Sequence, residues 1–255
     1  MIFLSITVTL GCLLITSITI LTLHKVRKVH LALFSLSEKM IAVERETKWL
    51  YQQLQSIYSL EKLLNCAKPL PTLRGWAASP DFLLGIAQHV LREKPQIVLE
   101  CSSGSSTIVL ARSMQLNGRG HVYSLEHDSR YSERTRVELA DQGLSDWGTV
   151  IDAPLQKLHD LEGHIWYALD QLPKDIKFDM LVIDGPPKDT CPLARYPALP
   201  ALLSRLSAGA SIFLDDASRE DEKKIAQRWA IEFPSLRQEQ LHYEKGCLKL
   251  TLPEN

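Results

Sequence analysis

The sequence predicts an α/β fold: a doubly wound, mostly parallel sheet that ends in a C-terminal antiparallel hairpin and follows a transmembrane helix and a long helical stalk. Three observations lead to this prediction. Residues 1–23 contain no charged side chain, and residues 26–64 repeat apolar side chains every three or four positions. From residue 80 onwards, short apolar runs alternate with segments of helical period, which is typical of parallel strands joined by helices.

The composition is that of a globular protein with one folded domain and an additional segment. Of the 255 residues, 45% are hydrophobic and 23% are charged, which excludes a disordered chain, a collagen-like repeat and a disulfide scaffold. The net charge is −1, but residues 24–68 have a net charge of +4, which leaves −5 for the rest of the chain. Nucleic-acid binding relies on clustered lysine and arginine, so we expect no nucleic-acid partner.

The first segment predicts a transmembrane anchor over residues 1–24. Its 22 apolar or small residues from Ile2 to Leu23 would form a helix of about 33 Å, enough for the roughly 30 Å hydrocarbon core of a membrane. The alternative is a cleaved signal peptide, but no basic residue precedes the apolar run and no cleavage site follows it. Lysine and arginine follow the run immediately, which predicts a single pass through the cell membrane with the rest of the chain in the cytoplasm. The five cysteines form no CxxC pair, as expected of reduced cytosolic thiols.

Residues 25–67 predict a helical coiled-coil stalk. Steps of three and four residues from Val26 to Leu64 meet twelve positions, of which ten are apolar, and no proline or glycine interrupts them. Such spacing is typical of a coiled-coil seam, and the anchor at one end would make the helices parallel, so we expect a parallel homo-oligomer. The alternative is a long amphipathic helix that packs on its own domain.

The domain is expected over residues 68–255. Three prolines in residues 68–80 predict a hinge, and Ser79, Pro80 and Asp81 predict the start of a helix. Helices are predicted at residues 82–94, 107–116, 130–141, 194–206 and 220–231. Strands are predicted at residues 96–100, 121–128, 149–154, 178–187 and 210–216, with a terminal hairpin over 238–252.

Each of the five strands ends at an acidic residue: Glu100, Glu126, Asp152, Asp184 and Asp215 with Asp216. A single acid at such a place is more often a helix cap than a ligand group. However, the carboxyl ends of parallel strands meet at the ligand-binding edge of a sheet. Acids at all five strand ends therefore predict a binding site.

The domain resembles the class I S-adenosylmethionine-dependent methyltransferases over about residues 75–255. The resemblance lies in the runs VLECSSGSST, VYSLEHD, VIDAP and FDMLVIDGPP. It implies a seven-stranded sheet and S-adenosylmethionine as cofactor. It places Glu100 and the loop of Ser102, Gly104, Ser105 and Ser106 near the methionine end of the cofactor. It also places Glu126 at the ribose, His127 along the adenine, and Asp152 with Ala153 at the adenine amino group. The family usually has glycine where Ser102 stands, and often where Ser106 stands.

The resemblance extends in part to the metal-dependent catechol and caffeoyl-type O-methyltransferases. These enzymes use an aspartate after the fourth strand and an Asp-Asn pair after the fifth. Here Asp184, Asp215 and Asp216 stand at those places, which implies a possible Mg²⁺ site, with Asp184 and Lys188 as catalytic candidates and Asp184 also beside the cofactor. The alternatives are that Asp216 caps a helix, that Asp184 faces only the cofactor's amino group, and that Lys188 is a solvated loop lysine.

The segment after the fourth strand carries Arg195 and Tyr196, which could contact an anionic or sugar-like acceptor, although packing roles are slightly favoured. The function expected from these observations is a membrane-anchored S-adenosylmethionine-dependent methyltransferase. It would transfer the methyl group to oxygen of a small or membrane-associated acceptor, such as a lipid-linked or glycan-type molecule. One alternative is a non-catalytic membrane scaffold with a degenerate methyltransferase fold. Another is an NAD(P)-linked oxidoreductase, whose G-x-G-x-x-G motif is absent.

Overall fold

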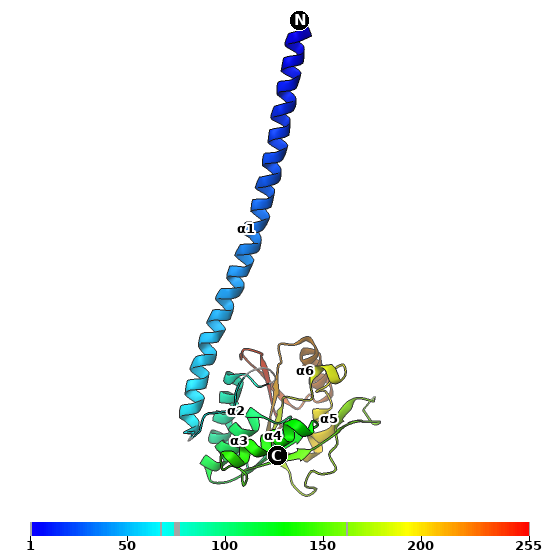
Figure 1. Ribbon diagram of the computed structural model, residues 1–255. Coiled ribbons are helices and arrows are strands. Elements are labelled where there is room, and N and C mark those ends of the chain that lie inside the picture. Colours follow the sequence, from blue (N-terminus) through cyan, green and yellow to red (C-terminus); the bar gives the residue numbers. More distant parts are fainter. Residues whose placement is uncertain (1, 67, 74–76, 162, 255) are drawn as a thin grey trace. The chain divides into compact units, whose positions relative to one another are not determined.

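A computed structural model describes residues 2–66, 68–73, 77–161 and 163–254 (Figure 1). The chain divides into two compact units, Met1–Tyr51 and Gln52–Asn255. The first unit is helical throughout its described length, and the second contains the sheet.

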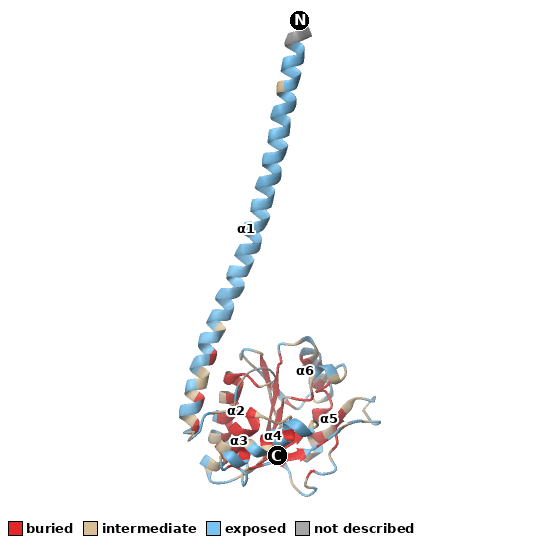
Figure 2. Cartoon of the chain, viewed as in Figure 1, coloured by how far each residue is buried: buried red, intermediate tan, exposed pale blue. Residues whose placement is uncertain are grey.

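Helix α1 runs without interruption over Ile2–Leu64. Judged by length and composition, one helix among the described residues is long and apolar enough to cross a membrane, and that helix is α1. Its hydroxyl side chains bond the carbonyl four residues earlier; this holds for Thr9, Thr16, Ser17, Thr19 and Thr22. These five hydroxyls are therefore satisfied within the helix, as a lipid environment requires. Apolar side chains along residues 6–50 are exposed (Figure 2).

The last turns of α1 belong to the second unit and pack on its core. Gln53, Leu60 and Leu64 are buried, whereas Leu54 is 57% exposed. Leu60 and Leu64 join a cluster that contains Phe82. These buried residues follow helical spacing and form one face of the helix. Residues 53–64 therefore match the alternative given for the stalk, an amphipathic helix that packs on its own domain.

The sheet has seven strands in the order β3-β2-β1-β6-β7-β9-β8. The strands are β1 Ile97–Cys101, β2 His121–Glu126, β3 Gly148–Asp152, β6 Phe178–Ile183, β7 Leu206–Asp215, β8 Arg237–Leu241 and β9 Cys247–Thr251. Strands β3, β2, β1, β6 and β7 pair in parallel, while β9 pairs antiparallel with both β7 and β8. The predicted seven-stranded, mostly parallel sheet with a terminal hairpin is confirmed.

Helices cover both faces of the sheet. They are α2 Pro80–Glu93, α3 Ser105–Asn117, α4 Ser129–Asp141, α5 Ala198–Leu202 and α6 Glu220–Glu232, with short 3₁₀ turns at Lys188–Thr190 and Leu203–Arg205. Neighbouring residues of β1 point to opposite faces: Val98 packs with α2 and α3, and Leu99 packs with α5 and α6. Helix α4 packs on α3 through a third cluster. Because both faces are buried, the strands read as continuous apolar runs.

The helix predicted over residues 194–206 is wrong in most of its length. The structure has α5 over Ala198–Leu202 only, a 3₁₀ turn to Arg205, and then β7, which starts four residues before the predicted strand. Pro197 lies at the N-cap of α5. Proline has no amide hydrogen and clashes with the preceding turn, so a helix can begin at this residue but cannot run through it from residue 194.

A two-stranded antiparallel hairpin was not expected from the sequence. It consists of β4 Leu155–Lys157 and β5 Ile165–Tyr167. Each strand has three residues, which is too short for an alternating pattern to be recognised. The side chains of Trp166 and Tyr167 are nevertheless fully buried in the main core.

Candidate functional site

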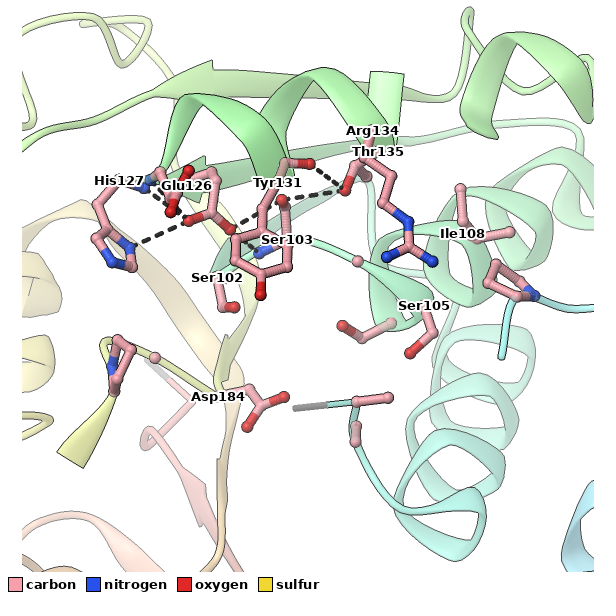
Figure 3. Close-up of a pocket in the computed structure, with 18 of the residues that line it drawn as sticks. Ser102, Ser103, Ser105, Ile108, Glu126, His127, Tyr131, Arg134, Thr135 and Asp184 are labelled. Carbon is pink, nitrogen blue, oxygen red and sulfur yellow. Dashed lines mark hydrogen bonds and ion pairs between the residues drawn. The ribbon is translucent and has the colours of Figure 1, made fainter. Parts of the chain in front are cut away.

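A cavity of about 470 Å³ lies at the carboxyl ends of β1, β2 and β6, beside the N-termini of α3 and α4 (Figure 3). Such an edge is where ligands bind in doubly wound sheets. Nine residues expected at the site line this cavity: Ser102, Gly104, Ser105, Ser106, Glu126, His127, Asp184, Lys188 and Asp216. The sequence therefore predicted nine of the residues that line this cavity.

Four expected residues do not line the cavity. Asp152 at the end of β3 accepts a hydrogen bond from Ser132 and pairs with Arg136 at 2.8 Å, and its side chain is 58% exposed. Ala153 is buried, and its amide donates to the carbonyl of Glu126 at 2.7 Å. Glu100 and Asp215 are fully buried.

Glu100 lies beneath the loop that follows β1. One carboxylate oxygen accepts hydrogen bonds from the hydroxyls of Thr107 and Ser124, and Thr107 in turn accepts one from the amide of Gly104. Burial raises the pKa of Glu100 to about 7, although the surrounding hydroxyls act in the opposite direction. This side chain supports the loop from below.

The loop between β1 and α3 has an unusual backbone. Gly104 has φ = 150° and Ser102 has φ = 107°, both in a region that favours glycine. The amide of Ser102 donates to the carbonyl of Leu125 at 2.9 Å, which ties the loop to β2. This conformation accounts for the glycine that the resemblance implies at the position of Ser102.

The carboxylate of Glu126 is held by the backbone around it (Figure 3). One oxygen accepts hydrogen bonds from the amide and hydroxyl of Ser103 at 3.0 and 2.9 Å. The other accepts from the amides of His127 and Asp128 at 2.9 and 3.0 Å. Burial acts to raise the pKa of Glu126, but the side chain of His127, 3.1 Å away, and then the bonds from Asp128 and Ser103 outweigh it, so the net shift is downward. Glu126 is therefore a fixed negative charge in the cavity wall.

A cluster of acids lies where β6 and β7 end. Asp184, Asp215 and Asp216 each offer an oxygen, and these atoms lie within 4.8 Å of one another. The guanidinium of Arg195 lies among them: its Nη2 is 2.9 Å from Asp216 and 3.4 Å from Asp184. Burial raises the pKa of Asp184 to about 6, which Arg195 counteracts and Asp216 reinforces.

Residues that the sequence did not single out complete the wall. Helix α4 contributes Tyr131, Arg134, Thr135 and Glu138, which follow helical spacing of three and four residues. This spacing, directly after the acid that ends β2, was a signal that could have found them. Ser103 was missed because small polar residues are common in loops. Arg219 and Lys245 come from other parts of the chain, and nothing in the local sequence marks them.

Residues 99–217, just under half of the chain, match a family model described as a methyltransferase domain. This match indicates a methyltransferase domain. Its resemblance to class I S-adenosylmethionine-dependent methyltransferases is confirmed, and the findings support an enzyme of that class. A search of curated proteins finds no match to the chain.

Solved structures show the same fold at low sequence identity. A methyltransferase from Podospora anserina, bound to S-adenosylhomocysteine, has a TM-score of 0.57 at 14% identity and covers 78% of this chain and 88% of its own. An O-methyltransferase from Bacillus cereus, also bound to S-adenosylhomocysteine, has a TM-score of 0.52 at 19% identity, with coverages of 77% and 90%. An O-methyltransferase from Streptomyces achromogenes involved in tomaymycin synthesis, in complex with S-adenosylmethionine, has a TM-score of 0.52 at 17% identity, with coverages of 77% and 90%. The methyltransferase domain thus shares its fold with O-methyltransferases.

Proposed function

We propose that the protein is a membrane-anchored S-adenosylmethionine-dependent methyltransferase that acts on an oxygen of a small or membrane-associated acceptor. The observation that carries this proposal is the cavity at the carboxyl ends of β1, β2 and β6, with the Glu126 carboxylate fixed in its wall. The cofactors of the similar solved structures support it.

The cofactor occupies the half of the cavity formed by β1, β2 and the loop between β1 and α3. Glu126 accepts hydrogen bonds from the ribose hydroxyls, and His127 lies along the adenine. Both oxygens of Glu126 already have protein donors, so a ribose hydroxyl must replace one of them. The hydroxyl of Ser103 is suited to this exchange, because that of Thr135, 3.2 Å away, offers it a second partner. The serines at the start of α3 and the amides there face the methionine carboxylate.

The acceptor occupies the half near Asp184 and Lys188. The acceptor oxygen attacks the methyl carbon, the carbon–sulfur bond breaks, and S-adenosylhomocysteine leaves as a neutral thioether. Lys188, exposed on the 3₁₀ turn after β6, takes the proton of the acceptor hydroxyl when its amine is unprotonated. Asp184 orients the acceptor and the cofactor between these groups.

The N-terminal helix anchors the domain. Its apolar length, its internally satisfied hydroxyls and the lysine and arginine that follow support a single membrane pass with the catalytic domain in the cytoplasm. The exposed apolar side chains of residues 26–50 support a parallel homo-oligomer through a coiled-coil stalk. Reporter proteins fused after Arg27 test the orientation: a signal from outside the cytoplasm would contradict it.

Titration calorimetry of S-adenosylmethionine and S-adenosylhomocysteine into the full chain in detergent tests the proposal. We expect both to bind, and Glu126→Gln to weaken binding by about tenfold or more, because a charged hydrogen-bond partner is lost. Glu133→Gln, on the exposed side of α4, is the matched control and should bind normally. Absence of binding in the wild-type chain would favour the non-catalytic scaffold.

The acceptor chemistry needs a separate measurement. Once a methyl acceptor is found, Lys188→Met should reduce the rate of transfer without changing the affinity for S-adenosylhomocysteine. A Lys188 variant with the wild-type rate over the whole pH range would remove this residue from the proposed catalytic site.

A further inference from the structure

Arg195 joins the ends of two neighbouring strands. It follows Ala194, is 3% exposed, and lies in the segment between β6 and α5. Its Nη1 donates to the carbonyl oxygen of Asp215 at 2.9 Å, and its Nη2 donates to the carbonyl oxygen of Asp184 at 2.6 Å. One guanidinium therefore bonds the backbone at the ends of both β6 and β7.

The same guanidinium neutralises the acids at those ends. Its Nη2 is 2.9 Å from an oxygen of Asp216 and 3.4 Å from one of Asp184, and its Nη1 is 3.8 Å from Glu222. The side chains of Arg195, Asp216 and Glu222 are each at most 4% exposed. Because these charges are almost completely removed from water, their attraction is weakly screened.

A divalent cation does not fit this set of donors as it stands. The Asp216 oxygen that binds Arg195 is also 2.8 Å from the guanidinium of Arg219. A metal ion that used this oxygen would lie beside two fixed positive charges and would be repelled by both. In addition, Asp215 is fully buried and does not line the cavity, so the three carboxylates do not face one open site.

We propose that Arg195 is a positioning residue that takes the place of a divalent cation in the acceptor half of the cavity. It holds the ends of β6 and β7 together and compensates the charge of Asp184 and Asp216, so the acceptor half works without a bound metal. This inference rests on the proposed methyltransferase function, but its test measures cation binding and does not depend on turnover.

The first experiment measures cation binding by the wild-type chain. The full chain in detergent is titrated calorimetrically with Mg²⁺, Mn²⁺ and Ca²⁺, and its thermal unfolding is followed with each ion and with chelator. We expect no binding at millimolar concentrations and an unchanged unfolding temperature. Binding that disappears in Asp216→Asn would overturn the proposal, whether or not the protein proves to be a methyltransferase.

The second experiment removes the guanidinium. Arg195→Met leaves the acids without their partner, so the variant should unfold at a lower temperature, and Mn²⁺ or Mg²⁺ should restore part of the loss. Adding Asp216→Asn should abolish this restoration. The matched control is Arg205→Met, which removes a half-buried arginine that also bonds backbone carbonyls but precedes the start of β7, whereas the acids lie at its end. Its unfolding temperature should not respond to the ions.

Two results of the second experiment contradict the proposal. One is an Arg195→Met variant as stable as the wild type, since the guanidinium would then hold nothing together. The other is a response to the ions that is equal in Arg195→Met and Arg205→Met, since the ions would then act elsewhere. If Arg195→Met does not fold even with the ions, the wild-type titration decides.

Discussion

Ser102 adopts a backbone conformation that residues with a Cβ atom rarely occupy. Its φ of 107° lies in the loop that carries the cofactor in the proposed function, and the hydrogen bond to Leu125 keeps the loop in place. Strain of this kind occurs at binding sites, where the surrounding structure over-determines the backbone. The departure from the usual glycine thus has a cost in stability, while the shape of the loop is retained.

Ser102→Gly should raise the free energy of unfolding by about 1 kcal/mol, because glycine adopts this φ without strain and only part of the gain is offset by the greater entropy of the unfolded chain. Chemical denaturation of the full chain in detergent measures this. Ser103→Gly is the comparison next to it: this variant removes the hydroxyl that bonds Glu126 and should lower stability. A loss of stability in Ser102→Gly would show that the serine side chain contributes more than its backbone costs.

Glu100 makes stability depend on pH. Its pKa rises from the ordinary 4.5 to about 7 in the folded protein, chiefly through burial. Between these values the folded chain holds a proton that the unfolded chain has released. The resulting stabilisation is complete below about pH 4.5 and is lost as the pH rises through about 7.

Glu100→Gln should remove this contribution, which is at most about 3 kcal/mol. We expect the difference in unfolding free energy between variant and wild type to favour the variant increasingly as the pH rises from 5 to 8. Denaturation at several pH values measures it. Asp184 and Asp215 also have raised pKa values, but they are present in both proteins and largely cancel. A difference that does not vary with pH would show that Glu100 is ionised throughout.

Among the elements, the long helix α1 has two environments. In its last turns, Leu60 is fully buried and Leu54 is 57% exposed. The apolar repeat placed Leu54, but not Leu60, in the predicted coiled-coil seam. Apolar spacing alone does not distinguish a helix face that packs on a second helix from one that packs on the domain. Burial is decided by the partner surface, which the local sequence does not contain.

Leu60→Ala should lower the free energy of unfolding of the domain by about 3 kcal/mol through lost burial and a cavity. Leu54→Ala is the matched control, since it makes the same change in helix propensity at an exposed position of the same turns, and should change the domain's stability little. Thermal and chemical denaturation of both variants test this. Equal effects of the two changes would mean that Leu54 is also buried, as in the proposed oligomer.

The β4–β5 hairpin places Tyr167 against the site. A Cβ atom added to Gly185 would lie 2.3 Å from the hydroxyl of Tyr167 and 3.0 Å from the Cβ of Ser102. The Tyr167 hydroxyl is buried and has no hydrogen-bond partner among the described residues. Gly185 is therefore required by this close approach.

Gly185→Ala should cost roughly 2 kcal/mol of stability through overpacking. Tyr167→Phe, which removes the clashing hydroxyl, should cost little alone and should recover part of the loss in the double variant. A double-mutant cycle in denaturant measures the coupling between the two positions. Additive effects would mean that the hydroxyl is not what limits the space at Gly185.

At the scale of the whole molecule, the proposed function assigns membrane attachment to the apolar part of helix α1. A variant that lacks residues 1–24 should leave the membrane fraction on alkaline extraction, whereas the full chain should remain in it, because about 20 apolar residues suffice to hold a chain in the bilayer. Binding of S-adenosylhomocysteine by the shortened variant checks that it is folded. A shortened variant that stays in the membrane would assign the attachment to another part of the chain.

The sequence predicted the fold well where apolar residues repeat with a regular period, and it predicted the site well where acidic residues follow the strands. The parallel strands and the acids at their ends followed from apolar runs in the sequence, and the other predicted residues of the cavity wall followed from the resemblance. Two predictions from local sequence failed: a helix was predicted through Pro197, and the β4–β5 hairpin was not predicted. The positions of Arg219 and Lys245, and the contacts of Arg195 with the acids, could not be predicted, because they depend on how distant segments fold together.

The terminal hairpin has a consequence for how copies of this protein can meet. Strand β8 forms one edge of the sheet, where unpaired backbone groups could join the sheet of another copy. Its sequence, RQEQL, has an exposed Arg237, Glu239 and Gln240, and charged edge strands resist such pairing and the aggregation that follows. In the proposed membrane-anchored protein, where many copies share one membrane surface, this edge would keep their sheets separate. The homo-oligomer proposed above would then form through helix α1 and not through the edge of the sheet.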